Sequence, residues 1–186
     1  MPERPGLRSL LRTLGRRIPR TRGTLRVPGL GAQVIIGRDR WGIPHIDAAT
    51  DADAWYGLGF AHAQDRGFQL ELLARAGRGT LAELVGPGGL PIDRLSRTLG
   101  FRRLADAQLT HLDPDMRAGI EAYVAGVNAG ASRTRPHELV ILRGRRTEWQ
   151  PADVLAFLGL QSLALAGNWD TELARLRILL ADGADA

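Results

Sequence analysis

The sequence predicts a mainly helical fold with a few short strands. Three long segments carry helix signals, because each follows a capping residue or has a proline in its first turn; they are 52–76, 114–129 and 151–165. Residues 25–27 and 33–38 are rich in β-branched or apolar side chains and predict short strands. The chain has 186 residues, 44% of them hydrophobic, which suffices for one ordinary core.

The first 22 residues form an arginine-rich arm, and residues 23–186 form the body. Eight of the 25 basic residues lie in the first 26 positions, against the single acid Glu3. The net charge of +5 therefore describes the arm, because the remainder is slightly acidic. No aromatic residue lies between the arm's arginines, so bases have no stacking platform, and we expect no nucleic-acid partner.

The arm carries no recognisable secretory signal. Its apolar residues have helical spacing but are interrupted by arginines, whereas a signal peptide needs an unbroken apolar run. Arg16-Arg17 resembles a twin-arginine signal, yet no apolar core follows. We therefore expect a cytoplasmic protein, with a periplasmic or secreted one as the alternative. We expect the arm to dock on another chain or to be disordered rather than to lie on a membrane.

The body begins after a run of turn signals between Pro19 and Gly31. Residues 41–46 predict a turn that leads into a short extended piece, because Pro44 disfavours helix at Ile43. Thr50 or Asp51 caps the long helix that follows. Small residues inside this helix indicate close approach by another backbone, as in a helix buried against a large partner; they are Gly57, Gly59, Ala61 and Ala63. Gly67 indicates a tight contact or a pocket.

Shorter elements follow. Residues 92–99 and 102–109 predict two short helices, and a longer helix runs from Asp113-Pro114 to about Ala129. Residues 136–149 read as a connector with one apolar run at 139–142. The helix that opens at Pro151 is broken at Asn168-Trp169-Asp170, and residues 172–180 are helical again, with Gly183 as the stop.

The chain offers little chemistry of its own. The absence of cysteine excludes disulfides and thiolate sites, and the absence of lysine excludes Schiff-base catalysis. No serine lies in a hydrolase elbow or lactamase motif, and the histidines lack metal-ligand spacing. We expect His45 and His62 to donate hydrogen bonds within the core, Asp65-Arg66 to form a buried ion pair, and Glu71 and Arg75 to form a helix-surface pair.

Several motifs in order resemble the α-subunit of the penicillin acylase family. The most specific is FAHAQDR at 60–66, followed by FQLE at 68–71. Others span nearly the whole body; they are GTL at 23–25, PGL at 28–30, RDRWGIPHI at 38–46, GTLAEL at 79–84, RTLG at 97–100, AYVAGVNA at 122–129, WQPAD at 149–153 and NWDTEL at 168–173. The bulky apolar residue that the family tends to have at position 67 is replaced by glycine.

The resemblance implies the αββα N-terminal-nucleophile hydrolase fold, in which a mainly helical α-subunit wraps a β-subunit. Family members are amidohydrolases made by self-cleavage of one precursor. The nucleophile, which we expect to be a serine, is the first residue of the β-subunit, so no catalytic residue is expected in this chain. Its free α-amino group, with a pKa of about 7.7–8.0, accepts the hydroxyl proton before an acyl-enzyme forms. The resemblance also implies processing near Ala186.

Two roles within this chain follow from the resemblance. Glu172 aligns with the family's α-chain calcium ligand, and the β-subunit would supply the remaining oxygens of a structural calcium site. An ordinary solvated charge is the alternative. The segment 161–169 lines the acyl pocket in relatives, so Leu163, Leu165, Ala166 and Trp169 are candidate contacts for an apolar acyl group of a small N-acyl substrate. These four residues could equally be ordinary helix core.

The sequence leaves a second function open. The body could be a catalytically inert acylase-like scaffold, with the basic arm serving as an interaction module. The residue that follows the processing site in the precursor distinguishes the two, because only serine, threonine or cysteine supports catalysis.

Overall fold

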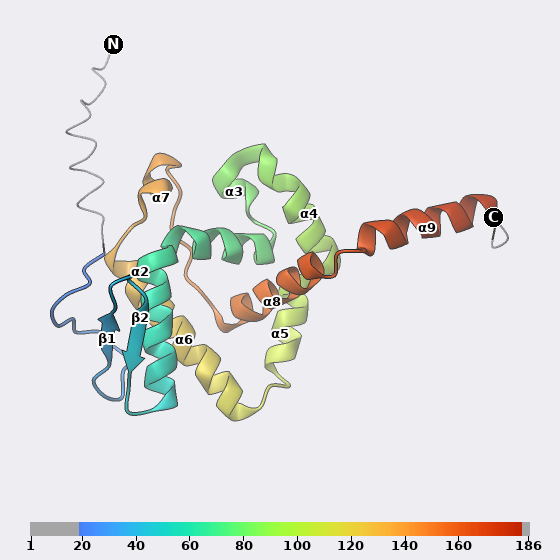
Figure 1. The fold of residues 1–186 in the computed structure, drawn as a ribbon. Coiled ribbons are helices and arrows are strands. Elements are labelled where there is room, and N and C mark those ends of the chain that lie inside the picture. Colours follow the sequence, from blue (N-terminus) through green and yellow to red (C-terminus); the bar gives the residue numbers. More distant parts are fainter. Residues whose placement is uncertain (1–18, 184–186) are drawn as a thin grey trace, which may run out of the picture.

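The computed structural model describes residues 19–183, and within this range the chain is helical apart from a single β-hairpin, which lies at one edge beside α2 (Figure 1). The predicted mainly helical class is confirmed. In chain order the elements are β1 (Ile35–Arg38), β2 (Pro44–Asp47), α2 (Asp51–Arg78), α3 (Ala82–Val85), the 3-10 helix η1 (Gly86–Gly89), α4 (Leu90–Leu99), α5 (Phe101–Leu109), α6 (Pro114–Arg133), α7 (His137–Ile141), α8 (Pro151–Leu165) and α9 (Trp169–Asp182).

The hairpin pairs β1 and β2 antiparallel, with Ile36 opposite Ile46. Asp39 fixes its turn, because one carboxylate oxygen accepts hydrogen bonds from the N–H groups of Trp41 (2.9 Å) and Ile43 (3.0 Å). The strand predicted at residues 25–27 is wrong. Within the described part of the chain no strand lies beside this segment to pair with it, so it has no regular structure.

Helix α2 begins where the sequence predicts. The Thr50 hydroxyl accepts a hydrogen bond from the backbone N–H of Asp53 at 3.1 Å, and Gly79 ends the helix in the left-handed conformation (φ 70°). The helix is broken once, at Arg66, whose φ of −131° and ψ of 25° are not helical. Figure 1 shows the resulting sharp bend between its two halves.

Glycines let α2 and α6 approach to backbone contact. The predicted close approach is confirmed, but the backbone that α2 meets is α6 of this chain and not a large partner. A Cβ atom at Gly59 would overlap the Tyr123 carbonyl oxygen, and one at Gly126 would overlap the Tyr56 carbonyl oxygen. Gly130 meets the backbone of Phe60 in the same way. Larger side chains at these positions would push the helices apart.

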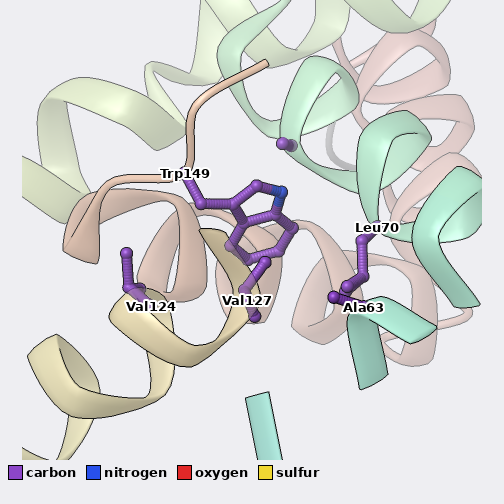
Figure 2. Packing of buried hydrophobic residues seen from close by; sticks show 6 residues of the cluster. Ala63, Leu70, Val124, Val127 and Trp149 are labelled. Atoms are coloured by element: carbon purple, nitrogen blue, oxygen red, sulfur yellow. The ribbon is translucent and has the colours of Figure 1, made fainter. Parts of the chain in front are cut away.

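The main core lies where these two helices meet the segment before α8. Trp149 points between α2 and α6, as Figure 2 shows. Asn128 holds the Trp149 backbone from both sides, since its amide donates to the Trp149 carbonyl and accepts from the Trp149 N–H, each at 2.9 Å. The buried members of the cluster are Ala63, Leu70, Ala74, Val124, Val127 and Trp149.

Buried carboxylates join segments that are distant in the sequence. The Glu71–Arg75 pair, expected on the helix surface, is buried instead: the Glu71 side chain is 3% exposed and lies 2.6 Å from Arg75 Nε. Glu71 also accepts hydrogen bonds from the backbone and hydroxyl of Thr147. The pair is therefore part of the interior that ties residues 142–150 to α2.

A second buried carboxylate, that of Asp153, connects three helices. It accepts hydrogen bonds from Arg78 of α2 at 2.7 and 2.5 Å, from Arg102 of α5 at 3.3 Å and from the Gln150 backbone. The hydrogen bond to Asp153 raises the pKa of Arg78. Removing one partner would leave a buried charge uncompensated, so this cluster fixes how α8 lies against α2 and α5.

Of three further expectations from the sequence, two are wrong and one is confirmed. Asp65 pairs with Arg38 (2.8 Å) rather than with Arg66, because the bend turns Arg66 outward to solvent. His45 is also exposed, contrary to the expected core position, because it lies on the solvent side of the hairpin. The expectation for Gly67 is confirmed: a Cβ there would lie 3.2 Å from Pro136, and the glycine lines a cavity of about 20 Å³.

Element boundaries extend beyond those predicted. The connector at 136–149 contains the short helix α7, whose Leu139 is fully buried. Helix α9 begins at Trp169 rather than Glu172, and Gly183 ends it as predicted. The arginine-rich arm falls largely on residues 1–18, which lie outside the described residues, so its boundary stays a prediction. Within residues 19–183 no helix is both long and apolar enough to cross a membrane.

The contact between α2 and α6 gives a direct test. We expect Gly126→Ala to lower the free energy of unfolding by about 3 kcal/mol, because the added methyl meets backbone that cannot move aside. Gly88→Ala is the matched control, since nothing lies within 4 Å of a Cβ there. Thermal denaturation of each variant, co-expressed with the remainder of its precursor, measures both effects. Equal melting temperatures for Gly126→Ala and wild type would mean that the helices are not this close.

Candidate functional site

The carboxyl-terminal helix α9 is the most exposed element of the described chain. None of its residues is buried, and Figure 1 shows it extending away from the body after α8. An isolated helix of this length is marginal in water. A helix that buries no residue within the described chain therefore indicates a surface that another segment covers.

One face of α9 is an apolar stripe, made by residues spaced three and four apart. Exposed fractions range from 44% for Trp169 and Leu173 to 78% for Leu180; the stripe consists of Trp169, Leu173, Leu176 and Leu180. Further large apolar side chains are exposed at Leu158 and Leu165 of α8. Contiguous apolar surface of this kind marks an interaction site.

Glu172 lies on this apolar stripe. It follows Trp169 by three residues and precedes Leu176 by four, so the three side chains share a face of the helix. The Glu172 carboxylate is exposed and accepts a hydrogen bond from Arg175 at 3.1 Å. Covering the stripe would remove this carboxylate from water, and its charge would then be compensated by Arg175 or by a bound cation.

The four candidate pocket residues do not all face the same surroundings. Leu163 packs against the small core formed by α5 and α8, which contains Phe101 and Ala156. Leu165, Ala166 and Trp169 are exposed, and Leu165 is 76% accessible. Leu163 thus has the core role, whereas the other three face a surface that the described chain does not complete.

A larger hollow lies at the opposite end of the molecule. This N-terminal cavity, of about 310 Å³, separates the segment 20–36 from α2. Its apolar lining includes Leu25, Val27, Leu30, Val34, Ile36, Tyr56 and Phe60, and three arginines also line it, Arg20, Arg22 and Arg38. None of the four predicted pocket residues lies here.

The histidine in α2 has a structural role. His62 Nδ1 lies 3.0 Å from the Tyr123 hydroxyl of α6, with the rings packed edge to face. Burial lowers the pKa of His62, against an opposing effect of Asp65, and burial raises the pKa of Tyr123. Both groups are therefore neutral near pH 7, and the contact is a neutral hydrogen bond between the two helices.

The described serines are not arranged for catalysis. Ser132 and Ser162 donate hydrogen bonds to carbonyl groups of their own helices, and Ser96 is buried without a hydrogen-bond partner among residues 19–183. Ser9 lies outside the described residues. In the same part of the chain no three His, Asp or Glu side chains come close enough together to hold a metal ion.

Sequence reasoning missed the N-terminal cavity and the buried carboxylates. Two of these acids, Asp53 and Asp153, could have been predicted as capping residues. Each follows a capping residue by three positions, Thr50 and Gln150, which is the spacing of a capping box. Asp53 also accepts hydrogen bonds from the N–H groups of Gly31 and Ala32, so it closes the loop before β1. That second contact spans more than twenty residues, and no local pattern indicates it.

Comparison with known proteins gives consistent matches. Residues 33–186 match the Penicillin amidase family. Penicillin acylase 2 proenzyme from Pseudomonas sp. (strain SE83) is 38% identical over 154 residues, which cover 82% of this chain and 20% of that protein. Acyl-homoserine lactone acylase QuiP from Pseudomonas aeruginosa is 37% identical over 171 residues, 90% of this chain and 20% of that protein. The chain thus spans about a fifth of the length of these curated relatives.

A solved structure agrees with these relatives. The thermostable Penicillin G acylase from Alcaligenes faecalis matches with a TM-score of 0.63 and 27% identity, over 82% of this chain and 86% of the solved chain. That solved polypeptide is therefore nearly the size of this one. Because the family match covers most of the chain and relatives above 30% identity cover more than two thirds of it, the chain belongs to the penicillin amidase family.

Proposed function

We propose that the chain is the α-subunit of a two-chain amidohydrolase that releases an acyl group from a linear amide. The observation that carries this proposal is the match to nearly all of a separate chain of a solved penicillin acylase, alongside a match to only a fifth of the whole relatives. One relative is named a proenzyme, which supports an origin of both chains in one precursor.

The placement of this chain's own serines and histidines decides which subunit we expect to hold the nucleophile. Ser132 and Ser162 donate hydrogen bonds within their own helices, His62 contacts Tyr123, and Ser96 is buried, so we assign the nucleophile to the proposed β-subunit. An N-terminal serine there would combine the hydroxyl with a free amine whose pKa of about 7.7–8.0 suits it to act as the base. In this proposal the α-subunit contributes binding surface, because α8 and α9 form one wall of the acyl pocket.

The proposed substrate is a small molecule with an apolar acyl group. Leu165, Ala166 and Trp169 lie within residues 165–169 and are all exposed. They offer apolar surface to a bound acyl chain. The names of the relatives include penicillin and acyl-homoserine lactone, both of which carry an amide-linked acyl group. Most of the pocket would belong to the β-subunit.

We further propose that Glu172 is a ligand of a structural calcium ion shared with the β-subunit. Calcium prefers about six to eight oxygen ligands, and the described residues bring no three acidic or histidine side chains together, so the proposed β-subunit would supply most of the oxygens. Its position on the apolar stripe supports the proposal, because covering α9 would bury the charge. A cation held by Glu172 and partner oxygens would compensate that charge.

The assignment of the nucleophile is tested by labelling. Co-expression of this chain with the remainder of its precursor should give an enzyme that hydrolyses an apolar N-acyl amide. A serine-directed sulfonyl fluoride should label the partner chain only, as read by intact mass of each chain. Ser96→Ala, Ser132→Ala and Ser162→Ala should retain the label and the activity. Label on this chain would contradict the two-chain mechanism.

The calcium site is tested by melting. In the two-chain protein, chelation should lower the melting temperature of wild type and leave Glu172→Ala nearly unchanged, since an ion that binds only the joined state stabilises it by mass action. Asp170→Ala, which removes an exposed acid of the same helical turn, should behave as wild type. An equal drop on chelation in wild type and Glu172→Ala would show that Glu172 does not hold the ion.

A further inference from the structure

A basic surface lies around helix α7, on the other side of the body from α9 (Figure 1). Residues 133–146 hold a single acid, Glu138, and five exposed arginines, which are Arg133, Arg135, Arg143, Arg145 and Arg146. Like charges gathered in this way repel one another and attract anions. We name these five arginines, together with Ile141 and Leu142, the α7 surface.

The arginines of the α7 surface have no carboxylate partner among residues 19–183. The nearby Glu138 lies 3.5 Å from His137 rather than against a guanidinium group. In this part of the chain, Arg143 and Arg145 form hydrogen bonds through their backbone groups only. Because a guanidinium group keeps its charge at any ordinary pH, two full positive charges are available here to a ligand.

Backbone contacts bring further arginines to the same end of the body. The Arg135 side chain donates to the Gly144 carbonyl at 2.6 Å and so joins the two ends of the segment around α7. Arg133 donates to the Arg26 carbonyl, which brings the segment 20–26 alongside. That segment adds three exposed arginines, which are Arg20, Arg22 and Arg26.

The tip of the α7 surface is apolar. Ile141 is 72% exposed and Leu142 is 42% exposed, directly before Arg143, while the buried Leu139 anchors the helix to the body. A bilayer surface matches this combination, because apolar side chains enter the acyl boundary while arginines bind lipid phosphates. Nucleic acid matches it less well, since residues 133–146 contain no aromatic side chain for base stacking and the apolar tip would stay in water.

We propose that the α7 surface binds the anionic headgroups of a lipid bilayer, with Ile141 and Leu142 entering the boundary between headgroups and acyl chains. The planar guanidinium groups of Arg143 and Arg145 each offer paired N–H donors to a phosphate. This surface belongs to the folded body, so the expectation for the arginine-rich arm is unchanged. The proposal uses no residue of α8 or α9 and is independent of the proposed amidohydrolase function.

Sedimentation with lipid vesicles tests the proposal on the co-expressed two-chain protein. Wild type should bind vesicles that contain phosphatidylglycerol at least about tenfold more tightly than vesicles of pure phosphatidylcholine. The double variant Arg143→Gln/Arg145→Gln should weaken binding to the anionic vesicles about tenfold, since each arginine near an anionic surface contributes to binding. The control Arg103→Gln/Arg117→Gln removes the same charge from exposed positions of α5 and of the other end of α6, and should bind as wild type.

The apolar tip is tested by a second pair of variants. Ile141→Ser should weaken binding to anionic vesicles about fivefold, because the isoleucine side chain leaves water when the surface binds. Met116→Ser is the control, since Met116 is 59% exposed at the start of α6, at the opposite end of that helix from Arg133. Equal melting temperatures check that each variant is folded. Wild-type binding by Ile141→Ser would contradict entry of the tip into the bilayer.

Three results would overturn the proposal. A two-chain protein that binds no anionic vesicle would show that this face is covered by the partner or has no affinity for lipid. Equal weakening by the two arginine pairs would show that net charge alone attracts the vesicles. Binding of duplex DNA that depends on Arg143 and Arg145, with vesicle binding independent of them, would assign the surface to nucleic acid.

Discussion

The backbone contact between α2 and α6 is the constraint on which the remainder of the structure depends. Gly59 and Gly126 let the two helices meet without intervening side chains, and the carbonyl oxygens of Tyr123 and Tyr56 occupy the space that a Cβ would need. The close approach brings His62 within hydrogen-bonding distance of Tyr123. It also creates the site that Trp149 fills, which in turn leads the chain into α8 (Figure 2).

Buried charge then sets the directions of the outer elements. Asp153 joins α2, α5 and α8 through Arg78 and Arg102, and Glu71 holds Thr147 in the segment before α8. Each acid is matched by donors, which explains why buried carboxylates are tolerated here. Their common result is to hold α8 against α2 and α5, and α9, which carries Glu172, extends from the end of α8. The N-terminal cavity stays open between the segment 20–36 and α2.

Local chemistry made much of the fold predictable. Thr50 as a cap, proline at the start of α6 and α8, and Gly183 as a stop all act within a few residues, so the sequence indicates them directly. The errors involve distant partners. Glu71 was expected at the surface because its contact with Thr147 lies 76 residues away, and residues 25–27 form no strand because no neighbour strand is present in the described chain. For the site, Glu172 and Trp169 lie on one exposed helix, whereas Leu163 turns into the core.

The central claim is that the exposed apolar surface of this chain is covered by the proposed partner, and expression of residues 1–186 alone tests it most directly. Light scattering and thermal denaturation would be measured on the single chain and on the two-chain protein. We expect the single chain to self-associate or to lack a cooperative transition, because α9 and the N-terminal cavity stay uncovered. We expect the two-chain protein to melt cooperatively. A soluble monomer of the single chain that melts cooperatively would contradict this account.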